Sequence, residues 1–349
     1  MRMPTHQYID RRTGRICSER PMGDRIVNFL YSEVWENAPL VFRALTSARS
    51  SSVLGYLNFE PLLSSKLGCA RRLMRQWGVD VTHCLDEPER LDTPGKLFTR
   101  KIRYWECRPM SKDPHVVVSP ADSRVLIGSL EKTSALYVKG KFFDYLDLLG
   151  SDKDRWLEAF AGGDFAIFRL TPDKYHYNHT PVTGRVEDVY ELDGNHHSCN
   201  PGSIVNMVTP YSKNKRAITL FDTQVAGGSG VGLVAMIEVV ALMVGKIRQC
   251  YSRYKYENPV PVRPGMFLEK GRPKSLFLPG SSTVILLFQP DRIQWDRDLL
   301  KYRSLTGVSS RFTHLLGAPM VETELTVRSQ IGRAAVAPAA TAETYGELL

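Results

Sequence analysis

One stretch of the chain, Leu278-Pro279-Gly280-Ser281-Ser282-Thr283-Val284-Ile285-Leu286-Leu287-Phe288, joins a turn to an apolar segment. Pro279 and Gly280 are typical turn residues, and the run 284–288 is typical of a buried β-strand. From residue 116 onward, similar short β-rich runs are separated by Gly and Pro, at 116–118, 135–138, 165–168 and 216–221. The sequence therefore predicts a β-rich domain of mainly antiparallel strands.

Helical patterns are concentrated before residue 80. Residues 24–30 and 61–77 carry apolar side chains three and four positions apart, which is the spacing of one helix face. A further helix is predicted within 143–160. The fold class is therefore predicted to be α+β, with a largely helical N-terminal region, a β-rich domain and a flexible Ala/Pro-rich tail, at residues 1–110, 111–325 and 326–349.

The Gly280-Ser281 pair has the chemistry needed for self-cleavage. The hydroxyl of Ser281 can attack the carbonyl of Gly280, because glycine leaves the carbonyl unhindered and tolerates a strained backbone. An ester then replaces the amide, and β-elimination frees the upstream chain and leaves dehydroalanine. Hydrolysis with loss of ammonia converts that residue into a pyruvoyl group at a new N-terminus. An ordinary turn explains the same residues, so the interpretation depends on partners elsewhere.

Two other segments supply candidate partners for this hydroxyl. Residues 170–181 are predicted to form a short helical turn that places His176 and His179 on one face. The strand predicted at 116–118 is followed by a turn that contains Asp122. A carboxylate that orients an imidazole beside a hydroxyl makes an Asp-His-Ser triad. Surface histidines and a turn carboxylate are the simpler alternative, and no nearby cysteine or third histidine has metal-ligand spacing, so no metal is expected.

The sequence resembles the phosphatidylserine decarboxylases, pyruvoyl enzymes that convert phosphatidylserine to phosphatidylethanolamine. The motifs that carry the resemblance stand in the family's order and roughly its spacing. They are Ser119-Pro120-Ala121-Asp122, the Tyr-His-x-x-His core of residues 170–181, Asn214-Lys215-Arg216 followed by 220–223, and Lys270-Gly271 leading to Gly280-Ser281. The first hundred residues are also similar to bacterial members that have a longer N-terminal region.

The resemblance implies a role for each residue of the site. Asp122 and His179 would assist Ser281 in cleavage after Gly280, and Ser281 would become the pyruvoyl group, a covalent cofactor made from the chain itself. His176 would lie in the decarboxylation pocket. Cleavage would give two subunits, 1–280 and 281–349, as partners of one another.

The cleavage motif leaves two candidate nucleophiles. Counting from Lys270-Gly271 makes Ser281 the nucleophile, whereas counting back from Thr283 favours Ser282. We prefer Ser281, because cleavage after glycine is sterically easier. Ser123, where the family usually has glycine, and Lys174, where an acidic residue is common, also depart from the pattern and leave an inactive relative open.

The chemistry of decarboxylation fits a pyruvoyl group independently. Loss of CO2 from an α-amino acid leaves a carbanion, and a pyruvoyl carbonyl serves as the electron sink, so no separate cofactor is expected. An acid such as His176 would protonate the carbon after CO2 departs.

The composition of the chain bears on the size of its core and on the cellular compartment in which it works. The chain has 349 residues, 43% of them hydrophobic, which is enough for a substantial core. Its six cysteines show neither metal spacing nor a dense disulfide pattern, which favours a reducing compartment. The most apolar run, 231–244, is short and contains Glu238, so a buried strand pair is predicted there instead of a transmembrane helix. A secretory signal is not expected, because the N-terminus has no apolar core.

Basic residues are concentrated in the N-terminal region. Residues 1–110 contain 18 Lys and Arg against 12 Asp and Glu, a surplus of 6 in a chain of net charge +9. Residues 71–77 mix basic and large apolar side chains, as a helix on an anionic membrane would. No recognisable nucleic-acid module accompanies the charge, so nucleic acid is not an expected partner.

The sequence therefore predicts a peripheral membrane enzyme that cleaves itself and decarboxylates phosphatidylserine on the cytoplasmic side of a bacterial membrane, as a homo-oligomer. Two alternatives remain at this point. One is a soluble pyruvoyl decarboxylase that acts on a free amino acid such as tryptophan. The other is a non-catalytic relative that binds membranes or partners without processing.

Overall fold

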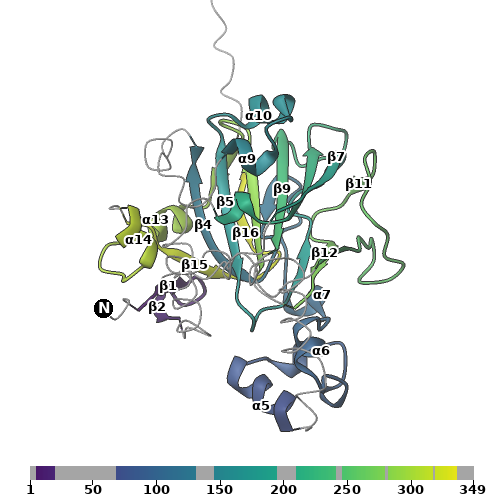
Figure 1. Ribbon diagram of the computed structural model, residues 1–349, viewed down its shortest axis with the longest axis vertical. Coiled ribbons are helices and arrows are strands. Elements are labelled where there is room, and N and C mark those ends of the chain that lie inside the picture. Colours follow the sequence, from purple (N-terminus) through teal and green to yellow (C-terminus); the bar gives the residue numbers. More distant parts are fainter. Residues whose placement is uncertain are drawn as a thin grey trace, which may run out of the picture.

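The computed structural model describes residues 5–19, 68–130, 145–194, 210–240, 246–279, 282–316 and 319–335. Its centre is a ten-stranded sheet (Figure 1). In spatial order the strands are β11 (Phe267–Leu268), β7 (Gly184–Leu192), β8 (Arg216–Asp222), β9 (Leu233–Val240), β13 (Ser282–Phe288), β5 (Asp164–Leu170), β4 (Ser123–Ser129), β15 (Glu322–Leu325), β1 (Gln7–Asp10) and β2 (Arg15–Ser18). Neighbouring strands are antiparallel except β1 and β15, which run parallel. The predicted α+β class with mainly antiparallel strands is confirmed.

β13 lies in the interior of this sheet. All seven of its residues pair with β9 on one side and with β5 on the other, and all are buried. An uninterrupted apolar run suits such a strand because both of its faces are covered. The strand predicted at 284–288 is confirmed, as are those at 116–118, 165–168 and 216–221. The run 135–138 lies outside the described residues.

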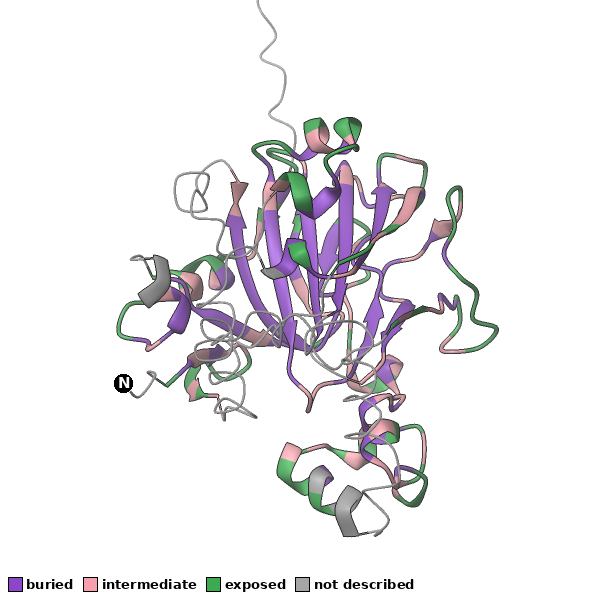
Figure 2. Ribbon diagram, viewed as in Figure 1, coloured by how far each residue is buried: buried purple, intermediate pink, exposed green. Residues whose placement is uncertain are grey.

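Side chains of β13 alternate between two separate cores. Val284, Leu286 and Phe288 pack on one face of the sheet, and Ile285 and Leu287 pack on the other. This alternation follows from the two-residue period of a strand. Figure 2 shows the buried strands in purple beneath helices whose outer sides are exposed.

Two small sheets cover the first face. One has the order β10 (Ile247–Gln249), β12 (Pro273–Phe277), β6 (Tyr177–His179), and the other has the order β14 (Ile293–Trp295), β16 (Gln330–Ala334), β3 (Val116–Val118). Phe277 and Ile331 reach the core of this face from the small sheets. α13 (Arg297–Arg303) adds Leu299 to it.

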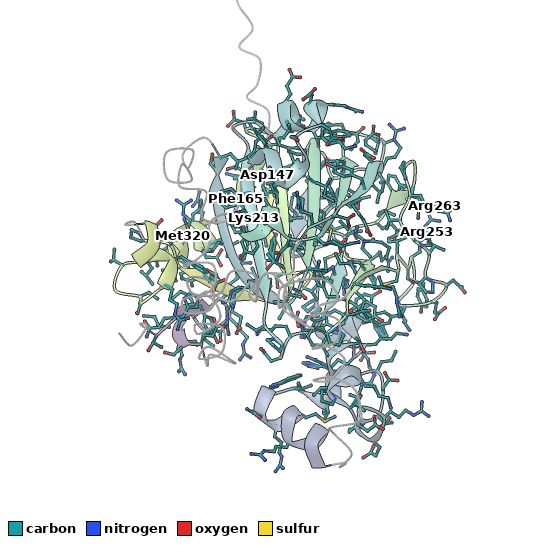
Figure 3. All side chains as sticks on the ribbon, viewed as in Figure 1. Asp147, Phe165, Lys213, Arg253, Arg263 and Met320 are labelled. Carbon is teal, nitrogen blue, oxygen red and sulfur yellow. The ribbon has the colours of Figure 1, made fainter. Side chains whose placement is uncertain are left out.

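Short helices cover the second face. They are α9 (Tyr145–Leu149), α10 (Asp154–Phe160), α12 (Pro210–Lys213) and α14 (Arg311–Leu316). Phe165 of β5 packs in the same core as Leu148 of α9. Figure 3 labels Phe165 and Asp147, the residue that precedes Leu148 in the sequence. A single helix was predicted within 143–160, and the structure has two over the described part of it. Gly150, which has φ of 100° in the left-handed region, separates them.

The N-terminal region differs from the prediction of a largely helical segment. Residues 7–10 and 15–18 form a β-hairpin at the edge of the main sheet, where Ile9 is fully buried. Tyr8 and Ile9 favour a strand, and Gly14, with φ of 68°, permits the turn. The helix predicted at 24–30 lies outside the described residues.

Helices do form the second part of that region. α5 (Gly68–Trp77) confirms the described part of the helix predicted at 61–77, and it is followed by η2 (Val81–His83), η3 (Pro88–Arg90), α6 (Pro94–Phe98) and α7 (Tyr104–Cys107). Met74, Leu91 and Leu97 form a separate small core there. α5 and α6 project away from the main sheet (Figure 1).

Two further segments correct the expectations. β16 lies within the range 326–349 that was predicted to be a flexible tail, and it is the central strand of its small sheet, where Ile331 is buried. The ordered fold therefore extends further than predicted, and residues 336–349 lie outside the described part. Instead of a strand pair at 231–244, the described residues form the single strand β9. Within the described ranges, no helix has the length and apolar character that crossing a bilayer requires.

Candidate functional site

The candidate site lies at one end of the main sheet, where β4 and β13 begin. Arg169 of β5 opposes Thr283 of β13 on one side and Arg124 of β4 on the other. The starts of β4 and β13 are therefore level and are separated only by β5, which amounts to about 10 Å at the usual spacing between strands. Asp122 immediately precedes β4. Gly280 and Ser281, which precede β13, lie outside the described residues.

Asp122 is a buried carboxylate that Arg108 holds in place. Nε of Arg108 donates to Oδ1 at 3.0 Å and Nη2 donates to Oδ2 at 2.8 Å, while the backbone N–H of Val327 donates to Oδ1 at 2.7 Å. Burial alone would raise the pKa of Asp122, but Arg108 outweighs it and the pKa is lowered. The orienting bond expected from Asp122 to His179 is absent among the described contacts, because both ring nitrogens of His179 bind other groups, the carbonyl of Gly271 and the hydroxyl of Tyr175.

The prediction of a helical turn at 170–181 is wrong. Residues 177–179 form β6, which pairs with β12, and the preceding residues make only a turn. Tyr177 and its neighbours suit a strand, and β12 supplies the hydrogen-bonding partner. Residues three apart in an extended chain point to opposite sides. His176 and His179 therefore do not share a face.

His176 is fully buried with both ring nitrogens unpaired. Its imidazole stacks on the ring of Phe98, with 3.5 Å between ring centroids, and within the described residues neither nitrogen has a hydrogen-bond partner. Burial, with a smaller contribution from Arg100, lowers the pKa of His176 to about 3. The side chain is therefore neutral at pH 7 and has two free positions for a proton donor or acceptor.

His179 is fully buried and held at both nitrogens. Nδ1 lies 3.0 Å from the carbonyl oxygen of Gly271, and Nε2 lies 3.0 Å from the hydroxyl of Tyr175. Because a carbonyl can only accept, Nδ1 carries a proton and Nε2 is the basic nitrogen of the neutral ring. Burial lowers the pKa of His179 to about 3. The backbone N–H of His179 donates to the carbonyl of Pro120 at 2.7 Å, which keeps this residue beside Asp122.

A chain of hydrogen bonds continues from His179 through two tyrosines. The hydroxyls of Tyr175 and Tyr256 lie 2.7 Å apart, and the Tyr256 hydroxyl donates to the carbonyl of Ile102 at 2.9 Å. From Gly271 to Ile102 there are four contacts, and each needs one proton. A neutral imidazole and two hydroxyls supply only three. Protonation of His179 supplies the fourth, so this chain of groups stabilises the imidazolium.

A buried ion pair links the main sheet to the sheet that carries the histidines. Glu238 of β9 accepts from Lys274 at 2.8 Å and from Gln249 at 2.9 Å on one oxygen, and from Asn178 at 3.0 Å and Ser275 on the other. Glu238 and Lys274 are both fully buried. Burial would raise the pKa of Glu238, but Lys274 and the hydrogen bonds lower it. The sequence reasoning missed this cluster, although a carboxylate inside an apolar strand was a usable signal.

Asn178, which lies between the two histidines in sequence, is fixed by this cluster. Its amide nitrogen also donates to the hydroxyl of Ser275 at 3.1 Å. Its carbonyl oxygen is buried and has no partner within the described residues, and the same is true of the hydroxyl of Ser282 at the start of β13. By its pairing with Val240, Ser282 lies on the same face of the sheet as Val284 and Glu238.

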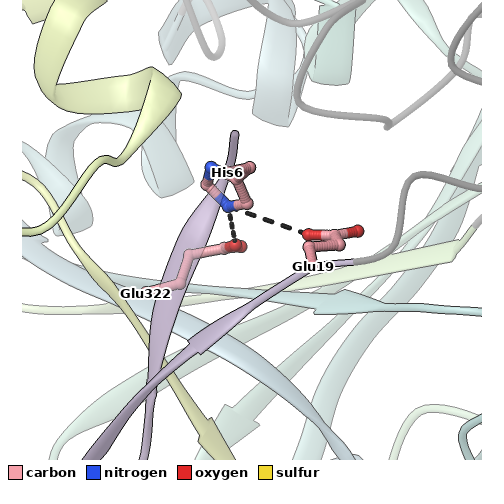
Figure 4. Close-up of side chains that lie close together, drawn as sticks. All are labelled: His6, Glu19 and Glu322. Carbon is pink, nitrogen blue, oxygen red and sulfur yellow. Dashed lines mark hydrogen bonds and ion pairs between the residues drawn. The ribbon is translucent and has the colours of Figure 1, made fainter. Parts of the chain in front are cut away.

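A second cluster, His6, Glu19 and Glu322, brings three possible metal-ligand atoms within 4.8 Å of one another (Figure 4). Nε2 of His6 lies 2.7 Å from Glu322, and Nδ1 accepts from the backbone N–H of Arg311 at 3.2 Å, so the proton resides on Nε2 and blocks it as a ligand.

Two arginines satisfy the carboxylates of this cluster. Arg169 binds Glu322 at 2.6 and 2.9 Å and Glu19 at 2.7 and 3.0 Å, and Arg124 binds Glu19 at 2.6 Å. With its charges already compensated, the cluster is an ion-pair network instead of a metal centre. It ties the N-terminal hairpin to β4, β5 and β15.

Comparison with known proteins identifies the chain's relatives. The family model for phosphatidylserine decarboxylase matches residues 95–312, which is more than half of the chain. The chain belongs to the phosphatidylserine decarboxylase family. A phosphatidylserine decarboxylase proenzyme of Bordetella petrii is 33% identical over 239 residues, which cover 64% of this chain and 78% of that protein.

More distant relatives align over most of the chain. A phosphatidylserine decarboxylase proenzyme of Chlamydia trachomatis is 29% identical over 309 residues, covering 87% of this chain and 93% of its own, and one of Clostridium botulinum is 28% identical over 301 residues, covering 86% and 94%. The region matched by the phosphatidylserine decarboxylase model contains Asp122, both histidines and the Gly280-Ser281 pair. The hairpin β1–β2 and strand β16 lie outside it.

Proposed function

We propose that this chain cleaves itself between Gly280 and Ser281 and then decarboxylates phosphatidylserine to phosphatidylethanolamine. The observation that carries the proposal is that the family match spans Asp122, His179 and the Gly-Ser pair. Support also comes from the described starts of β4 and β13, which are level at one end of the sheet.

In the proposed self-cleavage, Ser281 Oγ forms a bond to the carbonyl carbon of Gly280 as the amide C–N bond breaks, and the hydroxyl proton passes by way of His179 to the released nitrogen. Loss of the Cα proton of Ser281 then expels the Gly280 carboxylate. Water converts the resulting dehydroalanine to the ketone of a pyruvoyl group and releases ammonia. The products are the fragments 1–280 and 281–349.

His179 is proposed to take the hydroxyl proton of the serine through the hydroxyl of Tyr175, which contacts Nε2. Its Nε2 is unprotonated in the neutral ring, and the chain of hydrogen bonds through Tyr175 gains its missing proton when the imidazolium forms. The negative charge of Asp122 also favours the imidazolium, since it acts to raise the pKa of His179 against the larger effect of burial. Asp122 would therefore act through its charge instead of through a direct hydrogen bond.

His176 is proposed to handle the proton that replaces CO2. A pyruvoyl group supplies the electron sink for loss of CO2. The residues present fit such a group and its substrate, because His176 and Ser282 have buried polar atoms without partners in the described part of the chain. A neutral imidazole with two free nitrogens can accept a proton on one while it donates from the other.

Association with the membrane surface is part of the proposal. α5 carries the exposed basic residues Arg72 and Arg75 and projects from the body of the protein (Figure 1). We propose that it docks on the anionic cytoplasmic face of a bacterial membrane, where phosphatidylserine lies. A homo-oligomer is also proposed, and sedimentation analysis of the purified protein tests it.

The decisive experiment is the denaturing intact mass of the purified chain, with decarboxylase activity on phosphatidylserine in detergent micelles. We expect two fragments, the smaller beginning with a pyruvoyl group, and CO2 release from the lipid. Ser281→Ala and Ser282→Ala identify the nucleophile, because only one of them should abolish cleavage. An intact 39.4 kDa chain from a well-folded preparation contradicts the proposal. Activity on free amino acids but not on lipid contradicts the substrate.

A further inference from the structure

A basic cavity lies at the start of β12. Its volume is about 330 Å³, and it borders Gly271, whose carbonyl binds His179. Its lining includes the basic residues Lys112, Lys270, Arg272 and Arg328 and one acidic residue, Glu269. Arg272 and Glu269 pair with each other at 3.0 Å, which leaves a positive surplus in the cavity.

Lys270 contributes a buried charge without a carboxylate partner. Only 7% of the residue is exposed. Its ammonium group donates to the carbonyl oxygens of Asp113 and, at 2.9 Å, of Val116, and no carboxylate of the described residues lies within ion-pair distance. A buried cation is normally paired, since carbonyl dipoles alone compensate its lost hydration poorly. The lowered pKa of Lys270, about 8, reflects the same burial.

Arg328 contributes a second cation with an unused donor. Its Nη1 donates to the carbonyl of Tyr104 at 2.7 Å, but its Nε is buried and has no partner within the described residues. No ion pair of Arg328 is present among them either. The backbone of Arg328 adopts φ of 70°, which a non-glycine residue rarely does. Such strain accompanies residues that the surrounding structure holds in a set position.

We propose that this cavity binds a phosphate group carried by a phosphate monoester or diester. Two residues whose cationic groups lack carboxylate partners among the described residues line one cavity, and a phosphate offers such groups several acceptor oxygens. Guanidinium donors match phosphate geometry especially well. The residues that line the cavity precede β12 or belong to other segments, whereas the cleavage motif follows β12 in the sequence. The proposal therefore stands independently of the proposed function.

Isothermal titration of the purified full-length protein at pH 7 and low salt tests the proposal. The probes are inorganic phosphate, glycerol 3-phosphate and monomeric dihexanoyl phosphatidylglycerol. We expect one site per chain for at least one probe, and at least tenfold weaker binding after Arg328→Gln or Lys270→Gln. Tighter binding of the diester assigns the site to a phospholipid headgroup, whereas equal binding of inorganic phosphate assigns it to free phosphate.

The matched control is Arg12→Gln, which removes one positive charge from the exposed turn between β1 and β2 and should leave binding unchanged. Two variants of the cavity guard against misfolding of one of them, and thermal unfolding verifies each. The proposal is overturned if no probe binds to the folded protein, or if Arg328→Gln and Lys270→Gln bind as tightly as the control. Self-cleavage is scored separately by mass, so its failure is distinguishable from failure of this site.

Discussion

Replacing Tyr175 by phenylalanine should slow self-cleavage without unfolding the protein. The substitution removes the hydroxyl that joins His179 to Tyr256 and leaves the buried ring in place. Neutral His179 loses one contact of a chain that is already one proton short, whereas the imidazolium loses its acceptor at Nε2. The substitution therefore destabilises protonated His179 more than it destabilises neutral His179.

The structure sets the size of this effect. A hydrogen bond to a charged group contributes about 1.5–3 kcal/mol, and the bond lost from the imidazolium is of this kind. Since about 1.4 kcal/mol corresponds to a tenfold change in rate, self-cleavage should slow by about ten- to hundredfold. Tyr256→Phe should have a smaller effect, because it leaves the direct bond from Tyr175 to His179 intact.

The assay follows cleavage of freshly translated chain by intact mass, at a series of pH values. Tyr177→Phe is the matched control, because its ring stacks on Tyr175, with 5.5 Å between centroids, and its hydroxyl makes none of the contacts in the chain from Gly271 to Ile102. We expect Tyr177→Phe to cleave at the wild-type rate. Equal cleavage rates for Tyr175→Phe and Tyr177→Phe, in folded proteins, would refute the reasoning.

Three further predictions concern the framework of the site. Lys274→Met leaves the buried Glu238 carboxylate uncompensated. In a variant that cannot cleave itself, it should lower the free energy of unfolding in urea by about 3–5 kcal/mol. Adding Glu238→Gln should restore most of that stability, which checks the cause. Gly271→Ala should reduce the yield of folded, cleaved protein, because its φ is 71° and a Cβ atom would lie 2.3 Å from Met110 Sδ. Burial alone would raise the pKa of Glu322, but ion pairing lowers it to about 2, so its stabilising contribution is present above the ordinary pKa of 4.5 and is lost as the pH falls from there through about 2. Acid unfolding that is unchanged by Glu322→Gln contradicts this.

The sequence predicts the parts of the fold that local pattern determines. The apolar run 284–288 predicts a buried strand, and in the structure both faces of this strand are covered by neighbouring residues. Residue type and spacing made Asp122, the two histidines and Ser281 candidates, and the family resemblance implied their roles. Their contacts were not predictable, because the hydrogen-bonding partner of a histidine or an aspartate depends on which distant residue folds against it. Arg108 takes Asp122, and the carbonyl of Gly271 takes His179.

Pairing between residues far apart in the sequence explains most of the differences between the predicted and the observed structure. β1 pairs with β15, which lies more than 300 residues later, and a helical pattern nearby gives no hint of that contact. Tyr256 stands in a loop 81 residues after Tyr175, and nothing in its neighbourhood marks it as part of the site. The histidine segment satisfies helix-start rules at Thr171-Pro172, yet the free edge of β12 makes it a strand.

The interior position of β13 has a consequence for the order of events in the life of this protein. The proposed scissile bond immediately precedes a strand without which β9 and β5 would each lose a neighbour. The sheet also contains β15 (Glu322–Leu325), so it cannot be complete until synthesis has passed residue 325, well beyond the proposed scissile bond. After cleavage, β13 of the short fragment lies between β9 and β5 of the long fragment, and all seven of its residues pair with both strands. Severing the chain would thus produce a two-chain protein that can be separated only by unfolding it.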